Sequence, residues 1–338
     1  MNGRALTLRD RGARTCRPLL DVVDVVQEFR SHGPGGFGTR ICRPLSHVSF
    51  QVHAGESVGI AGESGSGKTT LARTIVQLPP PIAGQIWFRG DELTRLSGRR
   101  LRCRRRGIQM VFQDSFGSLN PSWRVAGIVE EPLIGDGMSR EQRRARVEEV
   151  LALVGLPASR FGERRPGTLS GGQCQRVAIA RAVVSRPALV VCDEAVSSLD
   201  VLLQAQMLDL FQTLQREYSL SYIFISHDLG VIRQLCDRIA VLHSGQLCEI
   251  GPIDAVFRHT AHPYTRALLA SVPSIERRRP RSMITGDAPS PLNPPTGCRF
   301  RTRCPVAGSR CATEEPRLEQ VAPSHFVACH FAGRPGAG

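Results

Sequence analysis

Residues 57–69 read SVGIAGESGSGKT, where a short run of small and β-branched residues leads directly into a glycine-rich segment. The pattern predicts a buried strand over Ser57–Ala61 and a helix from Lys68 to about Gln77. The segment between them satisfies G-x-x-x-x-G-K-[ST] in the strand–loop–helix context that this motif requires. Glycines let backbone N–H groups turn inward toward phosphate oxygens, and the positive end of the helix dipole strengthens that field. The sequence therefore predicts a phosphate-binding loop.

Two side chains at the start of the predicted helix have separate roles in holding a nucleoside triphosphate. The ammonium group of Lys68 can reach the β- and γ-phosphates, and the hydroxyl of Thr69 can coordinate Mg²⁺. The expected nucleotide-binding residues of the loop are Gly62, Glu63, Ser64, Gly65, Ser66, Gly67, Lys68, Thr69 and Thr70.

The rest of the chain up to about residue 251 alternates short β-branched strands with helical stretches. This is the pattern of an α/β protein with a mostly parallel sheet flanked by helices. Strands are predicted at 188–192 and 221–225, and a helix begins at Ser139, where Gln142 completes a capping box. No internal repeat is present, so we expect one nucleotide-binding unit.

The stretch 188–194, ALVVCDE, predicts an apolar strand that ends in two carboxylates. Asp193 at the strand tip can hold Mg²⁺ through water, and Glu194 can polarise the attacking water as a general base. Two further candidates follow predicted strands. His227 can contact the γ-phosphate and orient water or Glu194, and Gln113 can sense Mg²⁺ and water. A single His or Gln at a strand end is usually structural, so both assignments depend on the other motifs.

A second anion site is predicted at residues 169–173, LSGGQ, which precede a predicted helix over Cys174–Val184. Ser170 can cap this helix, and the two glycines leave its first amides open to an anion. One nucleotide does not need two phosphate sites in one chain, so we expect the second site to serve a partner subunit's nucleotide. This implies a dimer with the nucleotide sandwiched between subunits. The expected residues are Ser170, Gly171, Gly172 and Gln173.

Together these motifs resemble the ABC ATPase family. Their order is the family's order: phosphate loop, Gln113, LSGGQ, the Asp193–Glu194 pair, residues 198–200 (SLD) and His227. The resemblance covers nearly all of 20–260 and implies an ABC-type P-loop domain that binds ATP and Mg²⁺.

The resemblance also implies roles for single residues and segments. Gln113 would lie in the loop that couples to membrane subunits, and residues from about 114 to 168 would form a helical subdomain. Asp200 would organise the dimer interface, and Phe37 is the candidate for stacking on adenine. The LSGGQ motif is called the signature below. Cys174 follows the signature at a position where the family usually has a polar residue, and we expect its thiol to be open to oxidation.

Finer resemblance points to the ATPases of oligopeptide and dipeptide importers. Residues 111–121 (VFQDSFGSLNP), 262–265 (HPYT) and 289–298 (PSPLNPPTGC) are similar to that group. Residues 194–204 (EAVSSLDVLLQ) are instead similar to the related nickel importers, so nickel or a metallophore is the alternative cargo. We interpret 1–18 as an N-terminal tail, 19–260 as the nucleotide-binding domain and 261–338 as an importer-type C-terminal extension.

This resemblance implies partners and a location. The expected partners are a second ABC ATPase subunit, identical or homologous, and two transmembrane permease subunits. An extracytoplasmic substrate-binding protein would act indirectly. The expected location is the cytoplasmic face of the inner membrane, because no window of 18 apolar residues and no secretory signal is present.

Four of the eleven cysteines gather near the C-terminus. Their spacing is not that of a zinc ribbon, but four thiolates can hold a [4Fe–4S] cluster or, alternatively, zinc. The resemblance to peptide-importer ATPases favours the cluster, and the remaining alternative is four free thiols. The residues concerned are Cys298, Cys304, Cys311 and Cys329.

The net charge of +14 favours polyanionic partners. Two basic runs, 95–106 and 277–281, lack the interleaved aromatic residues of a base-stacking surface. ABC ATPases that act on DNA carry long coiled coils, and those that act on ribosomes usually carry two nucleotide units. Neither feature is present, so we expect no nucleic-acid partner. The charge can instead face anionic lipid, and the alternative is a high arginine content on solvated faces. Export is disfavoured because no membrane domain is present.

Overall fold

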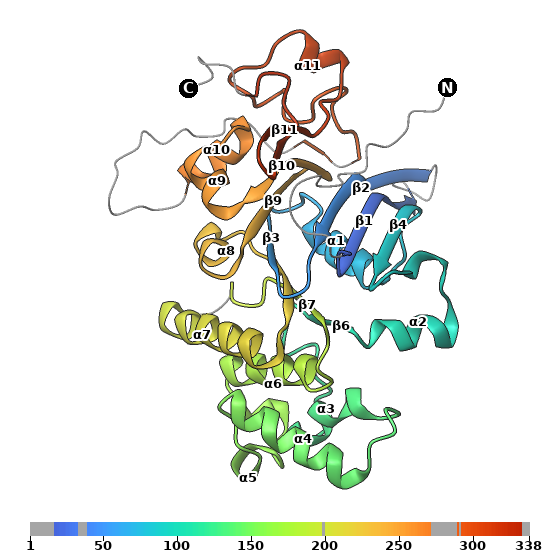
Figure 1. The fold of residues 1–338 in the computed structure, drawn as a ribbon, viewed down its shortest axis with the longest axis vertical. Helices are drawn as coiled ribbons and strands as arrows, with labels where there is room; N and C mark the ends of the chain where they lie inside the picture. The colour runs from blue at the N-terminus through green and yellow to red at the C-terminus, as the bar shows by residue number, and fades with distance from the viewer. Residues whose placement is uncertain (1–16, 33–38, 198–199, 272–288, 291, 333–338) are drawn as a thin grey trace. The chain divides into compact units, whose positions relative to one another are not determined.

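The described part of the chain, in a computed structural model, leaves out both ends and a few internal segments (Figure 1). The described residues within 1–53, 57–95 and 226–338 form one unit, and those within 54–56 and 96–225 form a second. Phe37 and residues 198–199 lie outside the described residues. The residues described are 17–32, 39–197, 200–271, 289–290 and 292–332.

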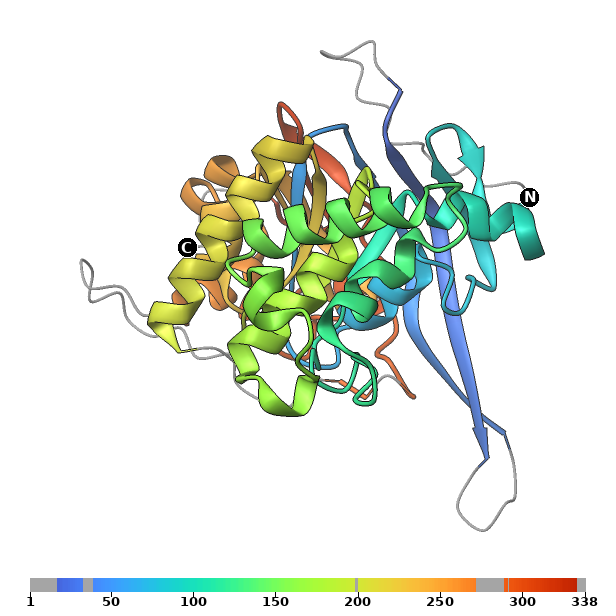
Figure 2. The same cartoon turned by 90° about the horizontal axis from the view of Figure 1, so that it is seen from below.

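The first unit contains two sheets. One is antiparallel, with strand order β2-β1-β4-β5, and Figure 2 shows its strands β1 and β2 as a long hairpin. In the other, β3 pairs in parallel with β9, and antiparallel pairs then lead through β10 and β12 to β11. The strands are β1 (Leu20–His32), β2 (Thr39–Val52), β3 (Ser57–Ala61), β4 (Ala83–Phe88), β5 (Asp91–Glu92), β9 (Arg238–His243), β10 (Gln246–Pro252), β11 (Glu319–Ala322) and β12 (His325–Val327). The α-helices are α1 (Lys68–Ile75), α8 (Leu229–Leu235), α9 (Ile253–Arg258), α10 (Pro263–Ala270) and α11 (Arg310–Thr313).

Strand β3 is buried along its whole length, as its apolar sequence predicts. A Cβ atom at Gly59 would lie 2.3 Å from Ile232, so α8 can approach this strand only because residue 59 is glycine. Helix α1 begins at Lys68 as predicted and ends at Ile75, two residues before the expected end. The carboxyl end of β3 and the start of α1 thus fix the two ends of the phosphate-binding loop.

The second unit contains three parallel strands in the order β8-β7-β6, with the register Asp193↔Ile225 between β7 and β8. The predicted capping box of Ser139 and Gln142 at α4 is confirmed, and the predicted cap at Ser170 is found as a capping box with Gln173 at the start of α6. The elements are α2 (Gly98–Arg105), β6 (Ile108–Val111), α3 (Val125–Glu130), α4 (Arg140–Leu153), α5 (Ala158–Phe161), α6 (Gly171–Val183), β7 (Leu189–Asp193), α7 (Val201–Tyr218) and β8 (Ser221–Ile225).

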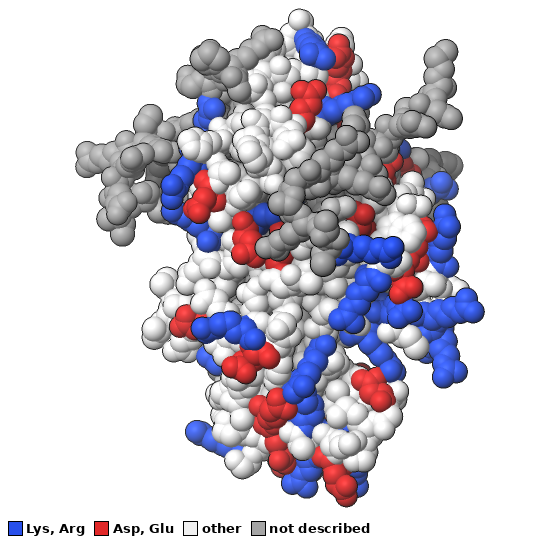
Figure 3. Space-filling view, in the orientation of Figure 1, with Lys and Arg blue, Asp and Glu red and all other residues white. Residues whose placement is uncertain are grey.

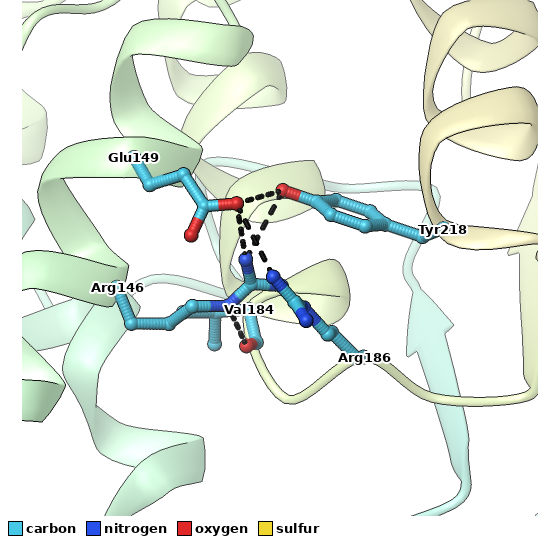
Figure 4. Close-up of polar contacts among 5 residues, drawn as sticks. All are labelled: Arg146, Glu149, Val184, Arg186 and Tyr218. Atoms are coloured by element: carbon cyan, nitrogen blue, oxygen red, sulfur yellow. Dashed lines mark hydrogen bonds and ion pairs between the residues drawn. The ribbon is translucent and has the colours of Figure 1, made fainter.

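A polar network ties three helical segments of the second unit together (Figure 4). Arg146 of α4 donates from Nε to the carbonyl of Val184 at 3.0 Å, just beyond the end of α6. Its Nη1 donates to Glu149 at 2.5 Å and to the hydroxyl of Tyr218, the last residue of α7, at 3.3 Å. The Arg146 guanidinium lowers the pKa of Glu149. The network fixes how the helix that carries the LSGGQ motif packs beside α4 and α7.

The C-terminal residues belong to the sheet of the first unit. Strand β12 pairs with β10, and the buried carboxylate of Glu249 on β10 lies 2.8 Å from the ring of His325 on β12. The same carboxylate accepts hydrogen bonds from the backbone N–H groups of Ala261 and His262. The α/β class is confirmed. Within the part of the chain that the structure describes, no helix combines the length and apolar character needed to span a bilayer.

Candidate functional site

Three glycines give the phosphate-binding loop its shape. Gly62, Gly65 and Gly67 have φ angles of 154°, 78° and 104°, which side-chain-bearing residues rarely adopt. A Cβ atom at Gly62 would lie 2.2 Å from the carbonyl of Leu242, and one at Gly67 would lie 2.3 Å from the carbonyl of Pro44. Next to Gly65, by contrast, nothing lies within 4 Å. The loop is closely packed at its two ends and open at its tip.

Lys68 is held across this loop by hydrogen bonds to its backbone. It is only 6% exposed, and its Nζ donates to the carbonyls of Gly62 and Glu63 at 2.7 and 2.9 Å. The N-cap of α1, Gly67, makes no side-chain cap hydrogen bond, so no capping side chain occupies the positive end of the helix. The buried hydroxyl of Ser66 has no hydrogen-bond partner in the protein. A loop with an ammonium group, uncapped amides and an unsatisfied hydroxyl fits the triphosphate of a nucleotide.

The remaining predicted residues of the loop lie at its tip and on the first turn of α1. Ser64 and Gly65 are exposed at the tip, while Thr69 and Thr70 lie partly exposed on the first turn of α1. A threonine hydroxyl at this position suits the oxygen coordination that Mg²⁺ prefers.

In the second unit, two of the predicted catalytic residues contact each other. The Nε2 of Gln113, just beyond β6, donates to Oε2 of Glu194 at 3.0 Å. Glu194 has a φ angle of 50°, a left-handed conformation that a glutamate adopts only when its surroundings enforce it. Its N–H donates to the carbonyl of Ile225, and Ser197 donates to its carbonyl at 3.0 Å and to its carboxylate at 3.3 Å. Asp193, the last residue of β7, is 2% exposed.

The signature residues form the start of α6. The hydroxyl of Ser170 accepts from the N–H of Gln173 at 3.3 Å, and the side-chain oxygen of Gln173 accepts from the N–H of Ser170 at 3.0 Å. No atom lies within 4 Å of a Cβ built at Gly171, and only the side chain of Leu203 approaches one at Gly172. The first turn of α6 is therefore capped yet sterically open.

Three other residues were predicted to belong to the site, and the structure describes two of them, Asp200 and His227. Asp200 is the N-cap of α7 and accepts from the N–H of Leu203 at 2.9 Å. His227 is exposed on the turn that leads into α8. Phe37, the adenine candidate, lies outside the described residues.

Two expectations about cysteines are wrong. Among the residues that the structure describes, no group of three or more His, Cys, Asp or Glu side chains is placed to hold a metal ion, which overturns the iron–sulfur cluster and gives no support to zinc. Burial raises the pKa of Cys298 to about 11 and raises the pKa values of Cys304 and Cys329, so these thiols are protonated at neutral pH. These residues and Cys311 are free thiols. Cys174 is buried with a raised pKa, so it is not a reactive thiol either.

Most of the basic run at 95–106 lies in helix α2, Gly98–Arg105, and Lys and Arg side chains gather on the surface there in Figure 3. Within this helix no residue is buried, so its charge faces solvent. This distribution fits an anionic surface as well as a simply solvated face, and the lipid contact stays a prediction.

Sequence reasoning missed two residues that contact the phosphate-binding loop. Tyr264 and Arg303, both C-terminal to residue 260, contact Glu63 of the loop. Tyr264 lies inside the HPYT motif, which marked the importer group without indicating a role. Arg303 is the last of three arginines at alternate positions over 299–303, and no motif or spacing there indicated a role.

Comparisons with known families and proteins agree with these motifs. The family model described as ABC transporter matches residues 45–197, and the one described as the C-terminal region of oligopeptide/dipeptide transporters matches 248–311. An oligopeptide transport ATP-binding protein, AppF, from Bacillus subtilis is 48% identical over 321 residues, which cover 93% of this chain and 97% of AppF. A putative peptide import ATP-binding protein from Brucella ovis is 43% identical over 315 residues, covering 92% and 97% of the two chains. These names support the peptide interpretation over nickel.

Solved structures show the same fold. The ATP-binding cassette MJ0796, in a dimeric post-hydrolysis state with ADP and phosphate, matches with a TM-score of 0.62 and 32% identity. The match covers 69% of this chain and 98% of that one. The cbiO1 protein from Clostridium perfringens, part of an ABC transporter complex, matches with a TM-score of 0.61 and 25% identity, covering 72% and 91% of the two chains.

Proposed function

Because this chain belongs to the ABC transporter family, among the ATP-hydrolysing subunits of the peptide importer group, we propose that it drives uptake of oligopeptides or dipeptides. The observation that carries this proposal is the phosphate-binding loop. Lys68, the uncapped N-terminus of α1 and the unsatisfied hydroxyl of Ser66 together offer the donors that a triphosphate needs.

Each catalytic side chain has a defined task in hydrolysis. Lys68 neutralises phosphate charge, and Glu194 accepts a proton from the attacking water as a general base. Gln113 orients the Glu194 carboxylate through the 3.0 Å hydrogen bond, and His227 orients the water. Mg²⁺ would supply further neutralisation of the phosphate oxygens when bound, and Thr69, Asp193 and the side-chain oxygen of Gln113 are the groups that would hold it.

The active form is a dimer of ATPase subunits. The signature turn, Ser170 to Gln173, binds the nucleotide of the partner subunit, and Asp200 lies at the subunit interface. Two apolar side chains that follow Asp200, Val201 and Leu202, are 83% and 70% exposed, which supports burial against another chain.

In the proposed complex, permease subunits bind the second unit near Gln113. The protein then works at the cytoplasmic face of the membrane that holds these permeases. Exposed Phe116 and Trp123 follow Gln113 in sequence, and large exposed aromatic side chains are typical of interface residues. In this proposal residues 1–18 are a tail, 19–260 the nucleotide-binding domain with its helical subdomain at 114–168, and 261–338 the C-terminal extension. A substrate-binding protein outside the cell delivers peptide to the permeases.

Transport of labelled substrate tests this function directly. The chain, co-expressed with its permeases and binding protein, should support ATP-dependent uptake of a labelled oligopeptide into vesicles, and Lys68→Ala should abolish ATP binding and uptake together. Radioactive nickel serves as the control cargo. Uptake of nickel without peptide would reject the proposed substrate class, and uptake unaffected by Lys68→Ala would reject the role of this chain.

A further inference from the structure

The C-terminal segment contacts the phosphate-binding loop through one side chain, Glu63. Nη1 and Nη2 of Arg303 donate to the two carboxylate oxygens of Glu63 at 2.8 and 2.9 Å, a bidentate arrangement. The side chain of Arg303 is 7% exposed and that of Glu63 is 27% exposed. Both residues belong to the first unit. This ion pair is thus largely withdrawn from water. Charges attract each other more strongly in the protein interior than in water.

A second contact holds the backbone of the same residue. The N–H of Glu63 donates to the hydroxyl of Tyr264 at 2.8 Å, and Tyr264 is fully buried. Burial raises the pKa of Tyr264, so the hydroxyl stays protonated at neutral pH. The N–H of Tyr264 in turn donates to Nδ1 of His262, the N-cap of α10. The hydroxyl position is therefore fixed by a capped helix start.

Arg303 is itself held in place by an aromatic cluster. Its N–H donates to the carbonyl of Phe300 at 3.0 Å, and the Phe300 ring lies 5.3 Å from the rings of both Tyr264 and His243. His243 ends β9, and the turn beyond it donates from the N–H of Gly245 to the carbonyl of Ser66 at 2.8 Å. The loop is thus contacted by the β9–β10 turn and by the C-terminal segment.

The charge of Glu63 makes this arrangement relevant to a nucleotide. A carboxylate within a phosphate-binding loop repels a triphosphate unless a cation offsets it. We propose that Arg303 and Tyr264 are positioning residues for ATP binding, which hold Glu63 in place. The backbone of Glu63 then keeps the loop amides aligned, and the Arg303 guanidinium offsets the charge of the Glu63 carboxylate. The inference rests on the proposed function, since it assigns two further residues to the same nucleotide site. It connects the importer-type C-terminal segment to nucleotide affinity.

Arg303→Met and Tyr264→Phe test the proposal, with Arg310→Ala as the matched control. Arg310 pairs with Glu314 in the same segment, in an exposed i, i+4 ion pair that does not touch the loop. Arg303→Met should weaken ATP binding about fivefold or more while kcat changes less than about twofold. Hydrogen exchange of the peptide over residues 62–68 should accelerate in the nucleotide-free protein for both test variants and stay unchanged for Arg310→Ala.

A double-mutant cycle separates the contact from general destabilisation. Glu63→Gln combined with Arg303→Met should bind ATP no more weakly than Arg303→Met alone, and Arg303→Lys should be intermediate because it keeps the charge but loses the bidentate geometry. ATP affinity and loop exchange equal to those of Arg310→Ala would overturn the proposal, and Tyr264→Phe provides this comparison if Arg303→Met does not fold. If the wild-type protein bound no ATP, the proposed function would fail too, which is a distinguishable outcome.

Discussion

Glu194 combines a strained backbone with a polar environment that fixes its carboxylate. Its φ of 50° carries a steric cost for a side-chain-bearing residue, of about 1–3 kcal/mol, which the surrounding contacts must offset. Hydrogen bonds from Gln113 and Ser197 and its own N–H to the carbonyl of Ile225 supply those contacts. A base held in one orientation loses less entropy when it acts on water.

Gln113→Leu should therefore lower kcat about tenfold or more, because it removes the hydrogen bond that orients Glu194 and the amide oxygen proposed for Mg²⁺. The matched control is Gln109→Leu on β6, whose amide donates only to the carbonyl of Arg106. Steady-state phosphate release and equilibrium nucleotide binding, measured on both variants, give the comparison. Equal kcat values for the two variants would remove Gln113 from the catalytic account.

Among the elements, α4 of the second unit carries a buried guanidinium, that of Arg146, beside the apolar side chains that it also buries. The side chain of Arg146 is 8% exposed and lies with its Cζ 4.7 Å from the centre of the Tyr218 ring, besides its hydrogen bonds to Val184 and Glu149. Truncation would leave the Val184 carbonyl without this donor and would remove one of the donors to the Glu149 carboxylate, which keeps its contacts with Tyr218 and Arg186.

We expect Arg146→Met to reduce the free energy of unfolding by about 3 kcal/mol. Arg144→Met on the same helix should change it by less than about 0.5 kcal/mol, because Arg144 is 82% exposed and pairs only with Glu148. Urea denaturation followed by circular dichroism measures both. Equal losses of unfolding free energy in the two variants would contradict a stabilising role for the Arg146 network.

How far the sequence predicts an element depends on how local its determinants are. Strands β3 and β8 and the caps at Ser139 and Ser170 follow from neighbouring residues, and all four are found where the sequence predicts them. The contact between Arg303 and Glu63 joins residues 240 positions apart and has no local pattern. The cysteine spacing allowed a metal site, but only the folded arrangement decides whether thiolates converge, and here it excludes that site among the described residues.

At the scale of the whole molecule, two buried histidines couple stability to pH. Burial lowers the pKa values of His243 and His262 from 6.5 to about 4. Between these values the unfolded chain binds protons that the folded chain does not, so the free energy of unfolding falls as pH decreases through this window. The contribution of these two histidines to the free energy of unfolding is fully present above 6.5, the pKa of the unfolded state.

Lowering the pH from 7 to 4 should therefore cost about 3 kcal/mol for each histidine. His262→Asn should remove part of this slope, because asparagine can still cap α10 but does not titrate. His259→Asn, at an exposed position, is the control. Denaturation curves at several pH values test the prediction, which fails if His262→Asn has the wild-type slope.

Glu194→Gln in the assembled transporter is the most direct test of the account, because it replaces the general base by a nearly isosteric amide. We predict ATP binding of wild-type strength, phosphate release at least about 100-fold slower, and accumulation of an ATP-bound dimer of ATPase subunits. The readout is single-turnover hydrolysis together with nucleotide retention on the isolated complex. Phosphate release at the wild-type rate would contradict the assignment of Glu194 and, with it, the proposed mechanism.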